Sequence, residues 1–325
     1  MCFQVPKMFT PNFTLHTGRI IPAIAFGTGT SYFERNDDVT EGIIKAFEAG
    51  FRYIDTAIMY QTEQGVGNAV KTLIKDRGFK REEFFITTKV NSQEYTYDKT
   101  MAAMKQSFEK LGLDYVDLVL IHSPGMPQGY KGDFSRFLSD DDIGKLPQTA
   151  ETYQEARISM WEALQDLKYQ GKIRDIGVSN FTSFHIEQLI TNPRCREVPV
   201  LNQIEFNPYC VDQDILDYCQ AKNILVQAYS PLGSDPGRNA AKNFTRVLEN
   251  ETMTRVAKAR GCTVAQVAIS WALSKGVSVS TKTEKPHRMK ENLAGANVTL
   301  TKEDIEAIDK LNIVQRVFWN PYEIQ

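Results

Sequence analysis

Hydrophobic and polar positions along the chain alternate between two periods. Short runs rich in β-branched, aromatic and aliphatic residues, several of them apolar on both faces, predict strands, and longer stretches with apolar residues three and four positions apart predict helices. We predict strands at 51–55, 84–88, 116–122, 175–178, 200–205, 224–229 and 277–280, and an eighth near 296–298. We predict helices at 39–49, 64–75, 97–111, 153–170, 184–190, 213–221 and, in two pieces, 253–275.

The order of these elements predicts the fold class. A strand followed by a helix, repeated about eight times without a reversal, favours a (β/α)8 TIM barrel of the α/β class over an open doubly wound sheet. A chain of 325 residues could hold two domains, but no Pro/Gly/Ser-rich linker divides it, so we expect a single barrel domain over 1–325. Ahead of the first unit, 12–15 and 19–20 flank a turn at 16–18 and predict a β-hairpin that closes the N-terminal end of the barrel. The Gly-, Pro-, Asp- and Ser-rich segment 123–152 predicts a long loop on the opposite, C-terminal face.

Composition excludes several classes of protein. With 42% hydrophobic residues the chain can fill a large core, and 38 Lys and Arg against 40 Asp and Glu leave a net charge of −2 that recruits neither nucleic acid nor a membrane surface. The five cysteines are widely spaced, without metal-ligand or CxxC spacing, which indicates reduced thiols and no metal. The sequence shows neither a signal peptide nor a membrane span, so we expect a cytoplasmic protein.

Polar residues end three consecutive predicted strands. Asp55 ends FRYID, Lys89 follows FFITT and His122 follows VDLVLI. Because a barrel gathers its strand ends around one pocket, we expect these side chains to face one another. A single such residue is more often a structural cap or a surface ion pair, but several in convergent positions favour a catalytic site.

Tyr60, five residues after Asp55, is predicted to bend over the same pocket. A phenol has an unperturbed pKa of about 10, and a neighbouring ammonium would lower it by stabilising the phenolate. Lys89 is the candidate ammonium, Asp55 would hold it charged and aimed, and His122 could orient a substrate oxygen by donating a hydrogen bond. The alternative for Tyr60 alone is a half-buried aromatic residue.

Seven motifs together resemble a known family. GFRYIDTAIMY, FFITTKV, LVLIHSP, IRDIGVSNF, LNQIEFNPY, VQAYSPLGS and STKTEKPHRMKEN occur in the order and spacing of the aldo-keto reductases, from about Phe13 to the C-terminus. Within the family the sequence is most similar to insect members, in the 3-dehydroecdysone reductase group. The resemblance implies a (β/α)8 barrel that reduces aldehydes or ketones with NADPH and without metal. It implies Tyr60 as proton donor, Asp55 and Lys89 as the residues that tune it, and His122 as the residue that orients the carbonyl.

The same resemblance implies a cofactor site. Ser179, Asn180 and Gln203 match residues that hold the nicotinamide carboxamide, and Tyr229 matches the aromatic residue that stacks on the ring. The remaining matches are to the loop along the pyrophosphate and one further cofactor contact: Ser230, Leu232 and Ser234, and Thr28. The alternative is strand-end hydrogen bonding for the three polar residues and core packing for the tyrosine.

Positive charge is concentrated at 282–292 in a chain that is otherwise nearly neutral. The segment contains Lys282, Lys285, His287, Arg288 and Lys290. Such a run is usually a solvated helix face, but Lys and Arg also suit a phosphate. The resemblance implies that Lys282, Thr283 and Arg288 bind the adenosine 2′-phosphate, with Glu291 and Asn292 on the adenine side. This favours NADPH over NADH, although Thr281 replaces the family's usual proline before the lysine.

Small or polar residues stand where aldose-reductase-like members usually carry tryptophan. These are Gly29, Asn91 and Ser123, and they predict a wide pocket for bulky substrates such as a steroid ketone or a long unsaturated aldehyde. The 123–152 loop, the loop after Ser234 and the tail 317–325 are expected to complete the pocket wall, with Phe318, Trp319 and Tyr322 as aromatic surface. Tail docking onto the barrel is the alternative for those aromatic residues.

Other functional classes are weaker or remain as alternatives. Gly65-Val66-Gly67 lacks the third glycine and the preceding strand of a dinucleotide fingerprint, and no GxSxG hydrolase motif is present. The alternatives are a non-catalytic NADP-binding regulatory subunit that kept the fold and a metal-free barrel isomerase or lyase. The only partner we expect is a small-molecule carbonyl substrate, and we expect a monomer.

Overall fold

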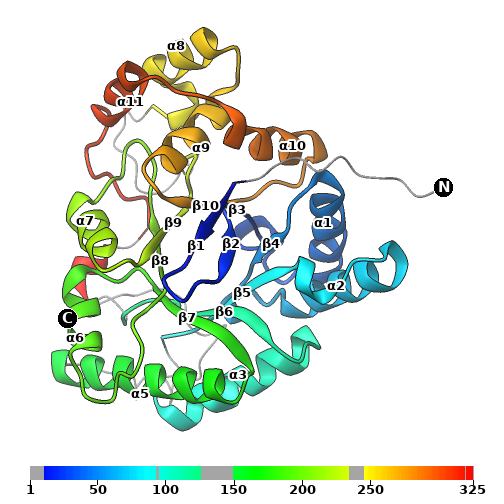
Figure 1. Ribbon diagram of the computed structural model, residues 1–325, viewed down its shortest axis with the longest axis vertical. Coiled ribbons are helices and arrows are strands. Elements are labelled where there is room, and N and C mark those ends of the chain that lie inside the picture. The colour runs from blue at the N-terminus through cyan, green and yellow to red at the C-terminus, as the bar shows by residue number, and fades with distance from the viewer. Residues whose placement is uncertain (1–10, 93–94, 126–148, 234–244, 319, 325) are drawn as a thin grey trace.

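A closed barrel of eight parallel strands forms the centre of the molecule. The computed structural model describes residues 11–92, 95–125, 149–233, 245–318 and 320–324. The barrel strands are β3 (Ile24–Gly27), β4 (Tyr53–Asp55), β5 (Phe85–Val90), β6 (Val116–Ile121), β7 (Ile173–Ser179), β8 (Leu201–Glu205), β9 (Leu225–Tyr229) and β10 (Ser278–Thr281). They follow one another in chain order around the barrel, and β10 closes it by pairing with β3 (Figure 1). The predicted α/β class and TIM-barrel fold are confirmed.

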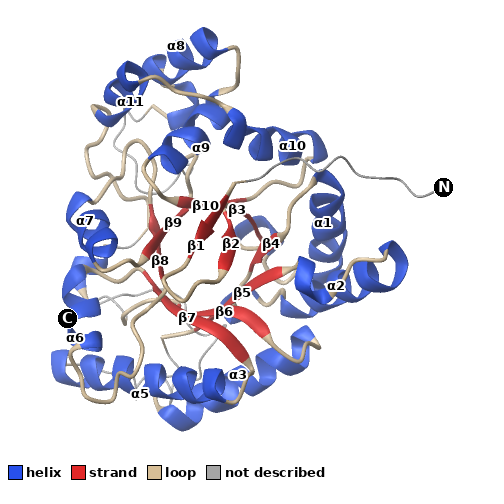
Figure 2. Cartoon of the chain, in the orientation of Figure 1, coloured by secondary structure: helices blue, strands red, loops and turns tan. Residues whose placement is uncertain are grey.

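A ring of helices surrounds these strands (Figure 2). The helices are α1 (Asn36–Ala49), α2 (Glu63–Arg77), α3 (Tyr97–Leu111), α5 (Ala150–Tyr169), α6 (Ser183–Ile190), α7 (Gln213–Ala221), α8 (Glu251–Arg260), α9 (Val264–Ser274), α10 (Pro286–Ala294) and α11 (Lys302–Asp309). Threonine hydroxyls accept a backbone N–H in the first turn of several helices and so fix where they begin. These N-caps are Thr96, Thr149, Thr182, Thr263 and Thr301.

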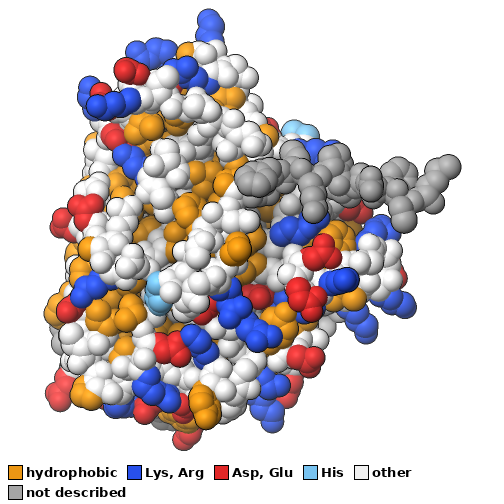
Figure 3. All heavy atoms as spheres, in the orientation of Figure 1, with side chains coloured by type: hydrophobic (Ala, Val, Ile, Leu, Met, Phe, Trp, Pro, Cys, Tyr) orange, Lys and Arg blue, Asp and Glu red, His pale blue; other side chains and the backbone are white. Residues whose placement is uncertain are grey.

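The N-terminal hairpin covers one end of the barrel (Figure 1). Strand β1 (Asn12–Thr14) pairs antiparallel with β2 (Ile20–Pro22), as the sequence predicted. Leu15 and Ile21 are buried and pack on residues at the beginnings of the barrel strands, among them Tyr53 and Phe85. Figure 3, which shows this side, has hydrophobic side chains gathered around the hairpin and charged ones spread over the surrounding helices. The hairpin therefore seals the N-terminal end and leaves the C-terminal strand ends for a site.

Two strand predictions differ from the structure. The first barrel strand is Ile24–Gly27, which the sequence pattern missed because it is four residues long and contains Ala25 and Gly27, two poor strand formers. The predicted strand near 296–298 is wrong. There the chain forms the 3₁₀ helix η5 (Gly295–Asn297), whose turn is closed by a bond from the Val298 N–H to the Gly295 carbonyl. The other seven predicted strands lie at β4 to β10.

The Gly65-Val66-Gly67 run serves helix packing. Both glycines lie inside α2, where a Cβ on Gly65 would come within 2.4 Å of the Asn36 carbonyl oxygen and one on Gly67 within 2.2 Å of the Leu111 carbonyl oxygen. The two glycines therefore let α2 approach the backbone of α1 and α3.

Among the helices of the described residues, none combines the length and hydrophobicity that a membrane span requires.

Candidate active site

The four predicted catalytic side chains meet at the C-terminal end of the barrel. Asp55 ends β4, Lys89 lies near the end of β5, His122 directly follows β6, and Tyr60 ends the 3₁₀ helix η2 (Ile58–Tyr60). The Lys89 ammonium lies 5.1 Å from the centre of the Tyr60 ring, and the rings of Tyr60 and His122 lie 5.6 Å apart and nearly perpendicular. We refer to these four residues as the strand-end cluster.

A buried ion pair lies beneath Tyr60. Lys89 is fully buried and Asp55 is 4% exposed, and the Lys89 ammonium donates to Asp55 Oδ1 and, at 3.0 Å, to the Thr56 carbonyl. The other carboxylate oxygen, Oδ2, accepts from Gln203 Nε2 at 3.1 Å and from Ser280 Oγ at 2.8 Å. These bonds satisfy both charges inside the protein, which is the condition for a buried pair to be stable.

Burial and neighbouring charges have opposite effects on the pKa values of Lys89 and Tyr60. Burial lowers the pKa of Lys89, but Asp55 and Tyr60 together outweigh it and leave the pKa raised, so the ammonium persists. Burial raises the pKa of Tyr60, and Lys89 counteracts this only in part through its charge and a hydrogen bond. The expected pull of Lys89 is present, but the net shift is upward, so without a ligand Tyr60 holds its proton at neutral pH.

His122 is a neutral imidazole in this site. Burial, and then the nearby Lys89 charge, lower its pKa to about 3. Its backbone N–H donates to the Val90 carbonyl at 2.9 Å, and its own carbonyl accepts from Asn180 Nδ2 at 2.9 Å, which fixes the residue from both sides. Within the described residues its Nδ1 is buried without a partner. A neutral imidazole carries one N–H, which can donate to an oxygen placed above Tyr60.

The proposed nicotinamide-side residues form a hydrogen-bonded row beside the cluster. Asn180 has a left-handed φ of 60°, which asparagine tolerates better than most residues. Its amide donates to Ser179 Oγ at 3.2 Å and accepts from the Tyr229 hydroxyl at 2.8 Å. Ser179 Oγ in turn donates to the Gln203 carbonyl at 2.8 Å. The structure thus brings Ser179, Asn180, Gln203 and Tyr229 together.

The side-chain amide of Gln203 uses its nitrogen, and not its oxygen, in the described hydrogen bonds. Its Nε2 donates to Asp55 at 3.1 Å and to Gln227 Oε1 at 2.6 Å, whereas no described bond uses its own Oε1. Gln227 continues the chain of bonds to the Tyr53 hydroxyl at 3.2 Å. The free Gln203 oxygen is an acceptor suited to the N–H₂ of a carboxamide. The donor set therefore fits a nicotinamide.

The C-terminal tail covers Tyr229. The Phe318 ring meets the Tyr229 ring edge-on at 5.4 Å, and burial raises the Tyr229 pKa well above 10. The backbone N–H groups of Val317 and Phe318 donate to the carboxylate of Glu205 at 3.0 and 3.1 Å. Glu205, which ends β8, was missed at the sequence level, although the strand-end rule that found Asp55 applies to it equally.

Further cofactor candidates lie around this row. Thr28 is buried and bonds the Asp55 carbonyl through its N–H at 3.0 Å and its hydroxyl at 3.3 Å. Ser230 has a left-handed φ of 51°, and Leu232 packs half-buried on the core. Ser234 lies outside the described residues.

The basic segment, residues 282–292, spans the end of β10 and helix α10. Lys282 Nζ donates to Ser31 Oγ at 2.7 Å, Thr283 is buried, and Arg288 is exposed in the first turn of the helix. α10 begins with Pro286, which lacks an N–H, and has no side-chain cap. The Arg288 N–H donates to the Lys285 carbonyl at 3.0 Å, so the His287 N–H is the one in the first turn for which the described residues show no acceptor. Two cations and an uncapped helix N-terminus fit a phosphate.

The two adenine-side candidates are less open. Glu291 accepts a hydrogen bond from the Thr263 hydroxyl at 2.7 Å, at the N-cap of α9, and Asn292 is 3% exposed. The structure therefore assigns Glu291 a partner within the protein. It places both residues on α10, one turn after Arg288.

The predicted pocket residues occupy different environments. A Cβ on Gly29 would lie 3.1 Å from the Tyr60 ring, so Gly29 borders the proposed proton donor itself. Asn91 is 7% exposed with an unpartnered Oδ1 among the described residues, and Ser123 is buried and donates to Gly125 O at 2.8 Å. Phe318 is 43% exposed, and Trp319 lies outside the described residues.

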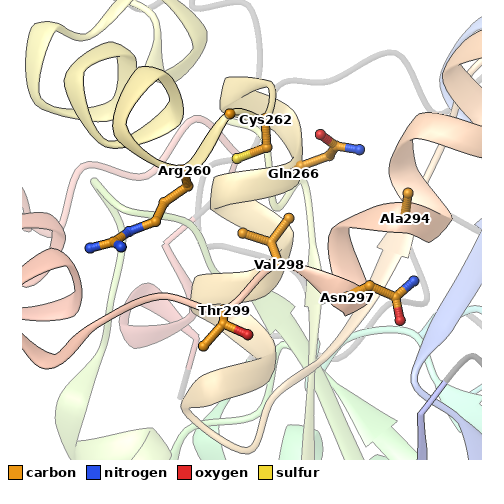
Figure 4. A pocket seen from close by; sticks show the side chains of 8 residues that line it. Arg260, Cys262, Gln266, Ala294, Asn297, Val298 and Thr299 are labelled. Atoms are coloured by element: carbon orange, nitrogen blue, oxygen red, sulfur yellow. The ribbon is translucent and has the colours of Figure 1, made fainter.

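Two of the hollows that the described residues form on the surface have volumes of about 450 Å³ each. One lies between α8, α9 and η5 (Figure 4) and is lined by Arg260, Gly261, Cys262, Gln266, Ala294, Asn297, Val298 and Thr299. It holds none of the predicted site residues, and Arg260 is engaged by Asp304. The other runs along the tail and includes Phe318, which joins it to Tyr229.

Among the described residues, no group of three or more His, Cys, Asp and Glu side chains could hold a metal ion.

Comparison with known proteins agrees with this geometry. Residues 23–313 match the model of the aldo/keto reductase family. The chain is 36% identical over 320 residues to a glyoxal reductase of Bacillus subtilis, covering 98% of this chain and 99% of the relative, and 36% identical over 300 residues to estradiol 17 beta-dehydrogenase 5 of Mus musculus, covering 92% and 90%. The crystal structure of the Bombyx mori aldo-keto reductase AKR2E4 in complex with NADP superposes with a TM-score of 0.82 at 32% identity and covers 95% of each chain. An insect protein is thus among the relatives, and this chain belongs to the aldo/keto reductase family.

Proposed function

We propose that this protein is an NADPH-dependent reductase that converts aldehydes or ketones to alcohols. The observation that carries the proposal is the placement of the Tyr60 hydroxyl, protonated at neutral pH, against the buried Lys89 ammonium and beside the neutral ring of His122. A proton donor, a charge that stabilises its conjugate base and a hydrogen-bond donor are what reduction of a carbonyl requires from the protein.

The cofactor has a place in this arrangement. Ser179, Asn180 and Gln203 would hold the carboxamide, Tyr229 would stack on the ring, and Lys282 with Arg288 would bind the 2′-phosphate of NADPH. Bound NADPH supplies the hydride that adds to the carbonyl carbon. The family relative solved with NADP supports this choice of nucleotide.

The residues of the strand-end cluster orient the carbonyl, donate the proton and stabilise the phenolate that remains. The His122 N–H orients the carbonyl oxygen toward Tyr60, and the Tyr60 hydroxyl donates its proton to that oxygen as negative charge develops there. Lys89 stabilises the phenolate that remains, and Asp55 keeps the ammonium in place. This contribution lies within the roughly 10²- to 10⁴-fold range of a positioned general acid.

We further propose a bulky carbonyl substrate, such as a steroid ketone or a long unsaturated aldehyde. Gly29 adds no side chain beside Tyr60, and Phe318, whose ring meets Tyr229 edge-on, is 43% exposed and could offer apolar surface to the far end of such a substrate. The relatives carry names that refer both to a small dialdehyde and to a steroid, so the fold alone does not select the substrate.

The assembly is also proposed. We expect residues 1–325 to form one barrel domain and the protein to be a monomer, since pairing of β10 with β3 leaves no barrel strand edge open to another chain.

A direct experiment tests the reaction. Purified protein is mixed with NADPH and a panel of ecdysteroid ketones, unsaturated aldehydes, diketones and sugars, and absorbance at the reduced-nicotinamide band is followed. We expect turnover with the bulky carbonyls, loss of at least about 100-fold in Tyr60→Phe, and unchanged NADPH binding in that variant. Retained turnover in Tyr60→Phe would refute the assignment, and equal rates on sugars and bulky carbonyls would refute the substrate class.

A further inference from the structure

Ser280 lies inside the barrel, below the strand-end cluster. Side chains alternate along a strand, so Val279 of β10 packs in the core between barrel and helices while Ser278 and Ser280 face the interior. Ser280 is 8% exposed, and its hydroxyl donates to Asp55 Oδ2 at 2.8 Å across 225 residues of sequence. The last strand of the barrel thus contacts the carboxylate that ends the second.

A glycine makes this contact possible. Strand β3 lies between β10 and β4, and its last residue, Gly27, pairs in register with Asp55. A Cβ on Gly27 would lie 3.2 Å from Ser280 Oγ. The missing side chain leaves the space through which the hydroxyl reaches across β3.

The carboxylate needs this donor because it is buried. Asp55 Oδ1 faces Lys89, so Oδ2 depends on Gln203 and Ser280. Gln203 Nε2 donates one hydrogen to Asp55 at 3.1 Å and the other to Gln227 at 2.6 Å, and its bond to Asp55 is the longer one. The Ser280 hydroxyl donates to Asp55, and this hydrogen bond is the shorter of the two that Oδ2 accepts from Ser280 and Gln203. A buried charge with an unsatisfied oxygen is costly and free to rotate toward other donors.

We infer that Ser280 is a positioning residue: its hydroxyl holds the Asp55 carboxylate in the orientation that keeps the Lys89 ammonium against Tyr60. The inference rests on the proposed function and adds to it a residue from the last strand. Without the hydroxyl, Oδ2 keeps only the longer bond from Gln203, and the Lys89 ammonium, which the Thr56 carbonyl still holds, is positioned less firmly. Proton donation by Tyr60 slows, while the residues proposed to bind cofactor and substrate stay in place.

The kinetic test compares two serines of the same strand. In Ser280→Ala we expect kcat to fall about three- to tenfold, less than the full rate equivalent of one hydrogen bond to a charged group because Gln203 and Lys89 still bond the carboxylate, with KM for NADPH unchanged. The primary isotope effect measured with deuterated NADPH should rise, because the chemical step limits turnover more strongly. Ser278→Ala is the matched control: Ser278 is also buried and faces inward, and its hydroxyl has no partner among the described residues. An unchanged kcat in Ser280→Ala, or an equal loss in Ser278→Ala, would overturn the inference.

A second measurement does not depend on turnover. Urea unfolding is followed for Ser280→Ala in the wild-type and in the Asp55→Asn background. We expect Ser280→Ala to shift the unfolding equilibrium about tenfold in the wild type and much less beside the neutral Asn, since hydrogen bonds to charged groups are the stronger ones. Equal shifts in both backgrounds would refute the role of Ser280 even in an active enzyme. Conversely, the wild-type protein could oxidise no NADPH while the coupling between Ser280→Ala and Asp55→Asn persisted. That result would refute the proposed function but not the hydrogen bond between these two residues.

Discussion

The strand-end cluster and the basic segment are both polar regions of the same chain, and they are built in opposite ways. In the cluster, Lys89 and Asp55 are buried and form an ion pair, and Gln203 and Ser280 donate further hydrogen bonds to Asp55. In the basic segment, Lys282 and Arg288 are exposed, and α10 begins without a side-chain cap. The buried charges of the first region are neutralised within the protein, whereas the second presents exposed cations, of which Lys282 bonds to the Ser31 hydroxyl.

This difference separates the two tasks of the proposed enzyme. Residues that act on the transition state must be held in place before substrate arrives, because electrostatic stabilisation depends on preorganisation. Residues that bind a phosphate can remain solvated, since the ligand brings the opposite charge. Substitutions in the cluster should therefore affect folding and catalysis together, and substitutions in the basic segment should affect only nucleotide affinity.

The largest effect is expected from Lys89→Met, which removes the buried ammonium. Turnover should fall by about 10²- to 10⁴-fold, because the phenolate of Tyr60 loses its support. The free energy of unfolding should fall by about 3–5 kcal/mol, because Asp55 remains buried and unpaired. NADPH oxidation and urea unfolding measure the two losses.

The double variant Lys89→Met/Asp55→Asn separates these consequences. It leaves no unpaired charge at the buried site, so stability should return toward the wild-type value while activity stays lost. If Lys89→Met kept wild-type stability, the contrast between an internally satisfied cluster and a solvated basic segment would fail at its strongest point.

The next effect concerns a buried histidine that supports the tail. His185 accepts the Thr182 N–H at Nδ1, at 3.2 Å, and its Nε2 faces the Ile324 carbonyl at 3.0 Å. Burial first, and then Arg157, lower its pKa to about 4. The unfolded chain takes up a proton near pH 6.5 and the native chain only near pH 4, so stability is present above pH 6.5 and is lost as pH falls between these values.

We expect this histidine to account for about 2 kcal/mol of the stability lost between pH 6.5 and pH 5. The pH dependence of urea unfolding should therefore be shallower in His185→Gln than in the wild type. His287→Gln, at an exposed position of α10, is the matched control and should leave the slope unchanged. Parallel curves for wild type and His185→Gln would contradict the prediction.

The sequence predicted the strand-end cluster because one physical rule covers its members. Parallel strands end at the same face, so polar residues after apolar runs must converge, and this placed Asp55, Lys89 and His122 correctly. The rule needs no knowledge of which strands are neighbours. It applies to Glu205 as well, whose partners, two backbone N–H groups of the tail, carry no side-chain signal in the sequence.

Other features depend on distances that no local pattern encodes. Ser280 lies within a strand, in VSVST, and only closure of the barrel brings it to Asp55. The net pKa of Tyr60 requires burial to be weighed against Lys89, and the sequence supplied only the second of these. The strand Ile24–Gly27 was hidden because Gly27 lacks the side chain that would mark it, although that absence opens the space beside Asp55.

The last of the expected effects is confined to nucleotide affinity and tests the basic segment. In Lys282→Ala we expect NADPH to bind about 10- to 100-fold more weakly, since about 1.5–3 kcal/mol is typical of a hydrogen bond to a charged group. NADH affinity and the urea midpoint should stay unchanged, because Lys282 is exposed and its bond to Ser31 joins two surface side chains. Lys290→Ala removes the same unit of charge from α10 and measures the general field alone. Equal losses of NADPH and NADH affinity in Lys282→Ala would place Lys282 away from the 2′-phosphate, and a lowered urea midpoint would show that the basic segment, too, is part of what holds the fold together.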